Sequence, residues 1–197
     1  MASVTDLRVE EGECATLAPG SQRFKDVYRQ ERPRNAADVR KILGLSDDSL
    51  KPLHEAGACC VPSRRPAAIA SMEDLDAADP AVRSNARQLT YQAFDAYVYG
   101  GASRSSDHLV PMFDKYLELS KAVLNIAWLQ DIEVLNGATL TISANTHAVY
   151  ARKIIIHPTG RIVCHGATTF RVTSVEGLRR TLIDSVKNVV GATLIHQ

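Results

Sequence analysis

The sequence lacks the features of a membrane or secreted protein. No apolar run approaches the roughly 20 residues that a membrane-spanning helix needs. The first eight residues, Met-Ala-Ser-Val-Thr-Asp-Leu-Arg, contain no basic segment followed by an apolar stretch, which a secretory signal would have. The four cysteines are too few and too irregularly spaced for a disulfide framework. We therefore expect a cytoplasmic protein with reduced thiols and no insertion into membranes.

Common catalytic and metal-binding motifs are also missing. The chain has no Cys-x-x-Cys or His-x-x-x-His spacing, no glycine-rich phosphate loop and no Gly-x-Ser-x-Gly turn. Cys59 and Cys60 follow His54 and Glu55 closely, but adjacent cysteines rarely chelate one ion without help from a distant pair. A metal site and a redox-active thiol remain alternatives to unreactive, partly buried cysteines. We expect no metal and no cofactor.

The formal net charge of +1 hides an uneven distribution. Residues 1–144 hold 16 Lys or Arg and 20 Asp or Glu, a net charge of −4, whereas residues 145–197 hold seven and two, a net charge of +5. A basic C-terminal segment can attract an anionic polymer such as an acidic polysaccharide or a nucleic acid. The alternative is that it docks against the acidic half of the chain or a neighbouring subunit.

A repeated Gly-Ala-Thr triplet is the most informative pattern that is present. The triplets begin at Gly137, Gly166 and Gly191, which are 29 and 25 positions apart, and each follows an alternating or apolar run. This spacing is typical of strand-turn-strand units that stack in a solenoid. In the runs themselves, apolar residues alternate with polar ones, which predicts β-strands with the following inward side chains: Ile132, Val134, Leu140, Ile142, Ile154, Ile156, Ile162, Cys164, Phe170 and Val172.

Helical patterns precede and follow these strands. The spacing predicts a helix over 79–99 with Asp79 as N-cap, and a strongly apolar helix over 108–129 that covers the first strands. Asn35 and Gly44 are suited to begin and end a shorter helix. Residues 176–190 indicate a C-terminal helix.

The predicted fold class is therefore α+β, with a helical N-terminal half followed by a short parallel β-solenoid of two to three rungs and a C-terminal helix. The predicted domains are an N-terminal arm with short helices (1–78), a helical cap (79–130) and the solenoid with its terminal helix (131–197).

The stretch 131–175 resembles the rungs of parallel β-helix proteins, including bactofilin-like polymerising scaffolds and polysaccharide-active β-helix enzymes. The residues that carry the resemblance are Asp-Ile-Glu-Val-Leu-Asn-Gly-Ala-Thr-Leu-Thr-Ile and Ile-Ile-Ile-His-Pro-Thr-Gly-Arg-Ile-Val. Inward aliphatic residues are followed by Asn-Gly or Thr-Gly at a corner and then by another aliphatic pair. The resemblance covers less than a third of the chain and implies a fold only.

Basic and histidine side chains gather in the predicted solenoid. If Ile154, Ile156, Ile162 and Cys164 point inward, then Lys153, His157, Arg161 and His165 point outward and form a row, and these four are the candidate catalytic residues. Arg152, Lys153 and Arg161 are the candidate binding residues. In acidic-polysaccharide lyases such rows bind carboxylates and abstract a proton, and Asp131 and Glu133 can complete an acid–base group. An ordinary solvated face is the alternative.

Two functional hypotheses follow. The first is a non-catalytic, self-assembling scaffold or structural subunit, because two or three rungs enclose a small core and favour a homo-oligomer. The second is a protein that binds an anionic carbohydrate, or a lyase-type enzyme that uses the basic row; a protein partner or another anionic polymer is also compatible. The sequence does not decide whether the protein is an enzyme.

Overall fold

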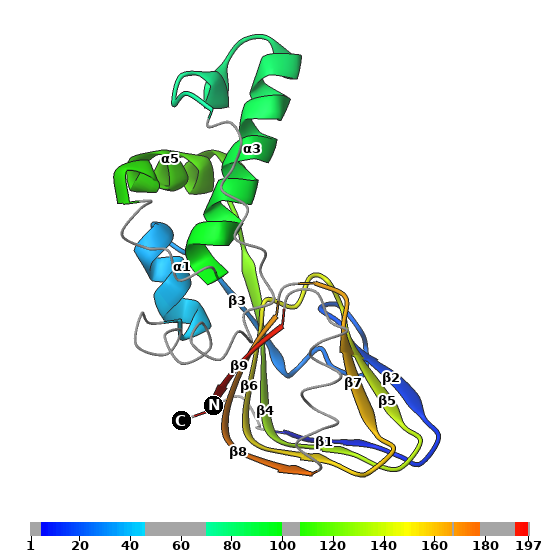
Figure 1. Ribbon diagram of the computed structural model, residues 1–197. Coiled ribbons are helices and arrows are strands. Elements are labelled where there is room, and N and C mark those ends of the chain that lie inside the picture. Colours follow the sequence, from blue (N-terminus) through cyan, green and yellow to red (C-terminus); the bar gives the residue numbers. More distant parts are fainter. Residues whose placement is uncertain (1–4, 46–69, 100–106, 167, 178–191, 197) are drawn as a thin grey trace. The chain divides into compact units, whose positions relative to one another are not determined.

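The computed structural model describes residues 5–45, 70–99, 107–166, 168–177 and 192–196 (Figure 1). The chain divides into two compact units, which we call the sheet unit (residues 1–31 and 124–197) and the helical unit (residues 32–123). The sheet unit contains the strands β1 (Thr5–Val9), β2 (Cys14–Leu17), β3 (Tyr28–Glu31), β4 (Leu124–Val134), β5 (Thr139–Ile142), β6 (Ala148–Ile156), β7 (Arg161–Cys164), β8 (Thr168–Gly177) and β9 (Ala192–His196). The helical unit contains α1 (Ala36–Leu43), α3 (Pro80–Tyr99), α5 (Val110–Ser120) and the short 3-10 helices η1 (Asp74–Asp76) and η2 (Asp107–Leu109).

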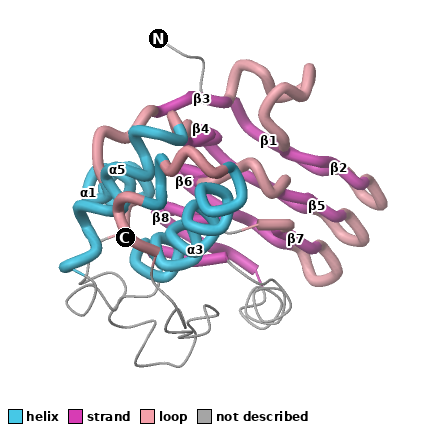
Figure 2. Tube along the Cα trace, turned by 90° about the horizontal axis from the view of Figure 1, so that it is seen from above, coloured by secondary structure: helices cyan, strands magenta, loops and turns pink. Residues whose placement is uncertain are grey.

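The strands of the sheet unit form two sheets. One follows the order β1-β4-β6-β8-β9 with parallel pairing throughout, and β3 adds to β4 in the antiparallel direction. The other follows the order β2-β5-β7, again with parallel pairing. A short turn joins β1 to β2, β4 to β5 and β6 to β7, so that neighbouring strands lie in matching order in both sheets (Figures 1 and 2).

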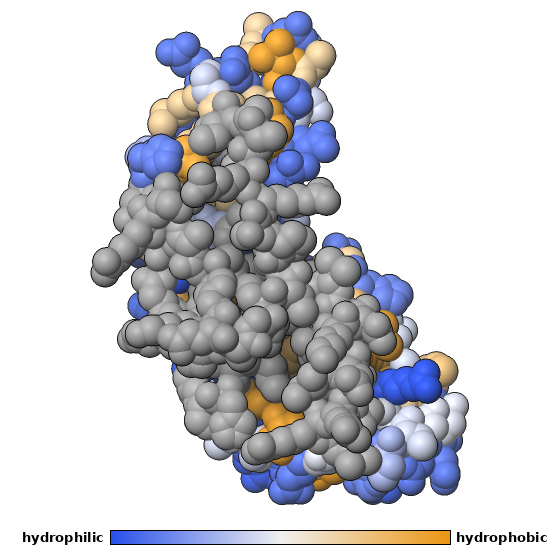
Figure 3. Space-filling view, in the orientation of Figure 1, coloured by the Kyte–Doolittle hydropathy of each residue, from blue (hydrophilic) through white to orange (hydrophobic). Residues whose placement is uncertain are grey.

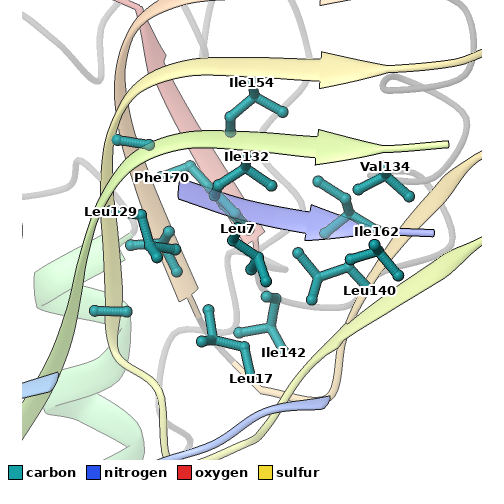
Figure 4. Close-up of a cluster of buried hydrophobic side chains, with 14 of the residues drawn as sticks. Leu7, Leu17, Leu129, Ile132, Val134, Leu140, Ile142, Ile154, Ile162 and Phe170 are labelled. Carbon is teal, nitrogen blue, oxygen red and sulfur yellow. The ribbon is translucent and has the colours of Figure 1, made fainter. Parts of the chain in front are cut away.

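The core of the sheet unit lies between the two sheets, and strand register builds it. Leu7, Ile132 and Ile154 are partners on β1, β4 and β6, and Leu140 and Ile162 are partners on β5 and β7. All of these side chains are at most 8% exposed and belong to one apolar cluster (Figure 4). Because successive side chains of a strand alternate between its two faces, this register places every second residue in the core. The inward residues predicted from the sequence are all buried.

The long strands change face once along their length. In β4 the core side chains are Ala127 and Leu129, then Ile132 and Val134, so two successive residues, 130 and 131, lie on the outer face. The same step occurs in β6 at Arg152 and Lys153. The strands bend in this region (Figure 1). As a result, the outer face before the bend carries Trp128 and Tyr150, whereas the outer face after it carries mostly charged groups.

The predicted short parallel β-solenoid behind a helical N-terminal half is wrong, and so is the fold class built on it. The strands form two parallel sheets in a mixed α/β chain, and the helices lie in the middle of the chain. The N-terminal residues do not form an arm: Leu7 and Val9 alternate on β1, Ala15 and Leu17 alternate on β2, and these pairs extend the core at the edge of each sheet. Most of the predicted C-terminal helix, 178–190, lies outside the described residues, and residues 176 and 177 end β8.

The helical unit confirms two predicted helices and corrects the third. Asn35 caps α1 by accepting a hydrogen bond from the Asp38 amide, and Gly44 ends that helix in a left-handed conformation. α3 begins at Pro80, as predicted. The predicted helix over 108–129 is wrong beyond residue 120, because Lys121 adopts a left-handed conformation with φ of 51°. Residues 124–134 then form β4, where pairing with β3, β1 and β6 satisfies their backbone groups.

The described helices include none with the length and apolar character to cross a membrane.

On the face shown in Figure 3, the side chains around the turns between the two sheets, at lower right, are mostly hydrophilic. These turns interlock: the Gly12 amide donates to the Asn136 carbonyl, and the Gly137 amide donates to Thr159 Oγ1 at 2.8 Å.

Candidate ligand-binding surface

The basic residues predicted to form one outward row are divided between the two sheets. Lys153 lies on β6 and His157 directly follows it, whereas Arg161 begins β7 and His165 follows β7. Arg161 and His165 are exposed, and Lys153 and His157 are half-buried.

Three of the candidate residues already have acidic partners. Lys153 Nζ lies 2.7 Å from Glu176 Oε2, and His157 Nε2 lies 2.9 Å from Glu133 Oε1. Arg152 donates two hydrogen bonds to Asp131, which hold the pKa of that carboxyl below its usual range. The structure thus brings Asp131 and Glu133 next to basic residues, and Glu133 also lies 3.6 Å from Arg8 Nη1.

The cysteines do not form a site within the described part of the chain. Cys14 is exposed and Cys164 is buried. Burial raises the pKa of the Cys164 thiol to about 12, so this thiol stays protonated and acts as a small core side chain. Cys59 and Cys60 lie outside the described residues. No group of three or more His, Cys, Asp or Glu side chains converges among the residues that are described.

Four side chains on neighbouring strands form a different surface, which we call the arginine–aromatic row: Arg29, Trp128, Tyr150 and Arg171. The rings of Trp128 and Tyr150 meet edge to face, with centroids 4.5 Å apart and planes at 81°. The Arg29 guanidinium carbon lies 5.1 Å from the Trp128 ring centroid, and that of Arg171 lies 5.8 Å from the Tyr150 ring centroid. From β3 through β4 and β6 to β8, the row therefore consists of a cation, two aromatic rings and a second cation.

Strand register produces this row. Trp128 is the partner of Tyr150, and Tyr150 is the partner of Arg171. Arg29 pairs with Ile126 on the antiparallel strand β3, which places it diagonally beside Trp128. The neighbouring residues Ala127, Leu129, Val149 and Ala151 point into the core, so the four side chains of the row share the outer face.

The row borders a shallow depression of about 350 Å³. Its lining comprises Trp128, Leu129, Tyr150, Ala151, Arg152, Arg171, Val172 and Thr173. Trp128 is 37% exposed, although a tryptophan on a sheet face is usually well covered. Burial is the main cause that raises the pKa of Tyr150; its hydrogen bond with Arg171 opposes the shift, and the charge of Glu31 adds to it. The depression is thus lined by the aromatic pair and by Arg152 and Arg171, while Arg29 contacts Trp128 from outside the lining.

This arrangement is suited to anion recognition. The exposed Arg29 guanidinium lies over the Trp128 ring, and its in-plane N–H donors are suited to bind a carboxylate or phosphate in a fork. Arg171 uses part of its hydrogen-bonding capacity on Tyr150 and adds positive charge at the other end of the row. Arg152 adds a third cation, which Asp131 holds in place.

Sequence reasoning missed the row because it assigned Trp128 to a helix and did not pair it with Tyr150. Trp128 is the only tryptophan in the chain, and its alternation with Leu129 and Ala127 was the available signal.

Comparison with known proteins found no match to this chain among family models, curated proteins or solved structures. The resemblance to bactofilin-like scaffolds and polysaccharide-active β-helix enzymes is therefore wrong, since it rested on a solenoid and the chain forms two parallel sheets instead.

Proposed function

We propose that this chain is a non-catalytic recognition protein that binds an anionic ligand at the arginine–aromatic row. The observation that carries the proposal is the in-register succession of Arg29, Trp128, Tyr150 and Arg171 on one outer sheet face, beside a depression. Tryptophan, tyrosine and arginine are the residue types that contribute most binding energy at interfaces.

The rigidity of the row supports the same proposal. Its side chains stand on paired strands, where the backbone is held by parallel and antiparallel hydrogen bonds. Edge-to-face packing of the two rings and the bidentate Arg152–Asp131 contact restrict the side chains further. Little conformational entropy is then lost on binding, which favours affinity.

The division of the predicted catalytic residues between the two sheets favours binding over catalysis. Lys153 and His157 each contact a glutamate, and the four candidates are distributed over two sheets. A general base acts from within hydrogen-bond reach of a substrate proton and in concert with neighbouring groups. The arginine–aromatic row instead has the donors and surface of a binding site.

The experiment is a binding titration with fluorescently labelled heparin fragments as the polyanion. The double variant Arg29→Gln/Arg171→Gln is expected to weaken binding about tenfold or more, because each charged contact at a solvent-accessible surface contributes up to about 1 kcal/mol and a tenfold change corresponds to about 1.4 kcal/mol. The matched control, Lys153→Gln/Arg161→Gln, removes the same charge from the basic residues identified in the sequence and is expected to change affinity less than about threefold. Equal losses in both double variants would contradict the proposal.

The homo-oligomeric scaffold and the cytoplasmic location remain predictions from the sequence. Native mass spectrometry of the purified chain tests the first: a defined oligomer supports self-assembly, and a monomer at micromolar concentration contradicts it. The heparin titration can be repeated on each oligomeric state. The comparison shows whether self-assembly changes binding at the row.

A further inference from the structure

We infer that the ligand of the arginine–aromatic row is an acidic carbohydrate, an oligosaccharide that carries both carboxylates and hydroxyl groups and lies across the strands. The inference rests on the proposed function and names the chemical class that the same surface selects.

The charges around the row are mixed. Arg29, Arg152 and Arg171 supply three positive charges, and Glu31 and Asp131 place two negative charges among them. Arg29 and Glu31 are two residues apart on β3 and therefore share its outer side, opposite Tyr28, which packs against the core. A ligand that offers only anionic groups along this path would meet these carboxylates at close range. A ligand that also carries neutral hydroxyl groups can place those groups beside the carboxylates instead.

The acidic side chains then have a positive role. A carboxylate accepts hydrogen bonds only, so a ligand that displaces water from the exposed Glu31 has to offer it a donor. Sugar hydroxyls are donors, whereas the sugar–phosphate backbone of DNA has none. Carboxylates of the same ligand suit the forked donors of the arginines. A molecule that carries both groups matches Arg29 and Glu31 together.

The aromatic pair favours a ring-shaped ligand. Trp128 is 37% exposed, so Arg29 and Tyr150 cover only part of its ring. The C–H groups of a sugar ring can pack against the exposed part while the hydroxyls stay at the periphery. From β3 to β8 the row crosses three strand spacings, about 14 Å. The surface can therefore accept several linked sugars, with the ligand axis perpendicular to the strands.

The test compares three probes of similar length by calorimetry: tetragalacturonate, the neutral tetrasaccharide maltotetraose, and a single-stranded thymidine pentanucleotide with four phosphates. We expect tetragalacturonate to bind at least about tenfold more tightly than either of the other two. Glu31→Gln should weaken tetragalacturonate binding several-fold and strengthen binding of the pentanucleotide. The matched control is Glu11→Gln, which removes an exposed acid in the turn after β1.

The outcomes separate the two proposals. If the pentanucleotide binds as tightly as tetragalacturonate and Arg29→Gln/Arg171→Gln weakens both, the row binds anions but the carbohydrate inference is overturned. If Glu31→Gln strengthens tetragalacturonate binding, the assigned role of Glu31 is also overturned. If none of the probes nor heparin binds, the proposed function itself fails.

Discussion

Trp128 and Tyr150 stand opposite each other on the parallel strands β4 and β6, with ring centroids 4.5 Å apart and planes at 81°. This contact lies on the outer face of the sheet, and Trp128 keeps 37% of its surface exposed. The two rings therefore stabilise the sheet only in part, and the exposed part of Trp128 is available to a ligand.

We predict that this ring contact has a measurable but modest energy. Trp128→Ala should lower the free energy of unfolding by about 1–2 kcal/mol, below the 3–5 kcal/mol typical of a buried tryptophan. A double-mutant cycle with Tyr150→Ala should give a coupling energy of about 0.5–1.5 kcal/mol in urea denaturation. A coupling energy near zero would mean that the rings do not interact in solution.

A charge in the core should unfold the sheet unit. Ile156 is 4% exposed and faces Val134 across β4 and β6, so Ile156→Asp buries a carboxylate without a partner, at a cost of several kcal/mol. The expected result is loss of the cooperative thermal transition followed by circular dichroism. Val163→Asp is the matched control, since Val163 lies on the other face of β7 between two core residues. If both variants melt at the same temperature, the inward face is assigned wrongly.

Gly160 should tolerate no side chain. A Cβ at this position would lie 2.7 Å from the Val134 carbonyl oxygen and 2.8 Å from that of Leu135, and neither backbone group can move away freely. Gly160→Ala should therefore cost about 2 kcal/mol or more in chemical denaturation. At Gly137, with φ of +71°, a Cβ meets nothing closer than 3.7 Å. Gly137→Ala should lower the free energy of unfolding by only about 1 kcal/mol, which is the cost of holding an alanine in the left-handed conformation. The reverse order of the two losses would argue against the interlocked turns.

Stability should fall in mild alkali because of Cys164. Burial raises the pKa of this thiol from 9.0 to about 12, so above pH 9 the unfolded chain releases a proton that the folded chain retains. The contribution of this thiol to the free energy of unfolding should be constant below about pH 8 and decrease by about 1–2 kcal/mol by pH 10. Cys164→Ala should abolish most of this decrease, and Cys14→Ala, at an exposed thiol, should leave it unchanged. If the free energy of unfolding of Cys164→Ala decreases by the same amount, groups other than Cys164 cause the alkaline destabilisation.

Local patterns in the sequence predicted much of the backbone and the core. Alternation identified the inward residues of β4 to β8, and the capping residues Asn35 and Gly44 marked the ends of α1. These features depend on neighbours within a few positions, so they can be read directly from the chain. The prediction failed at residues 121–129, where an apolar helical stripe and a strand alternation overlap and only long-range pairing decides between them.

The candidate surface was less accessible to sequence reasoning. The predicted basic residues lie on the strands or directly after them, as expected, but Lys153, His157 and Arg152 contact acids whose proximity depends on register. Arg29 and Arg171 are separated by more than a hundred residues and come together only through β4 and β6. Without the pairing of β3 with β4, nothing in the sequence connects Arg29 to Trp128.

The fluorescence of Trp128 tests the central claim most directly, because it is the only tryptophan of the chain and lies within the row. Titration with tetragalacturonate should shift or quench its emission in a saturable manner, with the same midpoint as calorimetry, and Arg29→Gln/Arg171→Gln should move that midpoint about tenfold higher. Saturable binding in the calorimeter with an unchanged emission spectrum would place the ligand elsewhere on the protein and contradict the account.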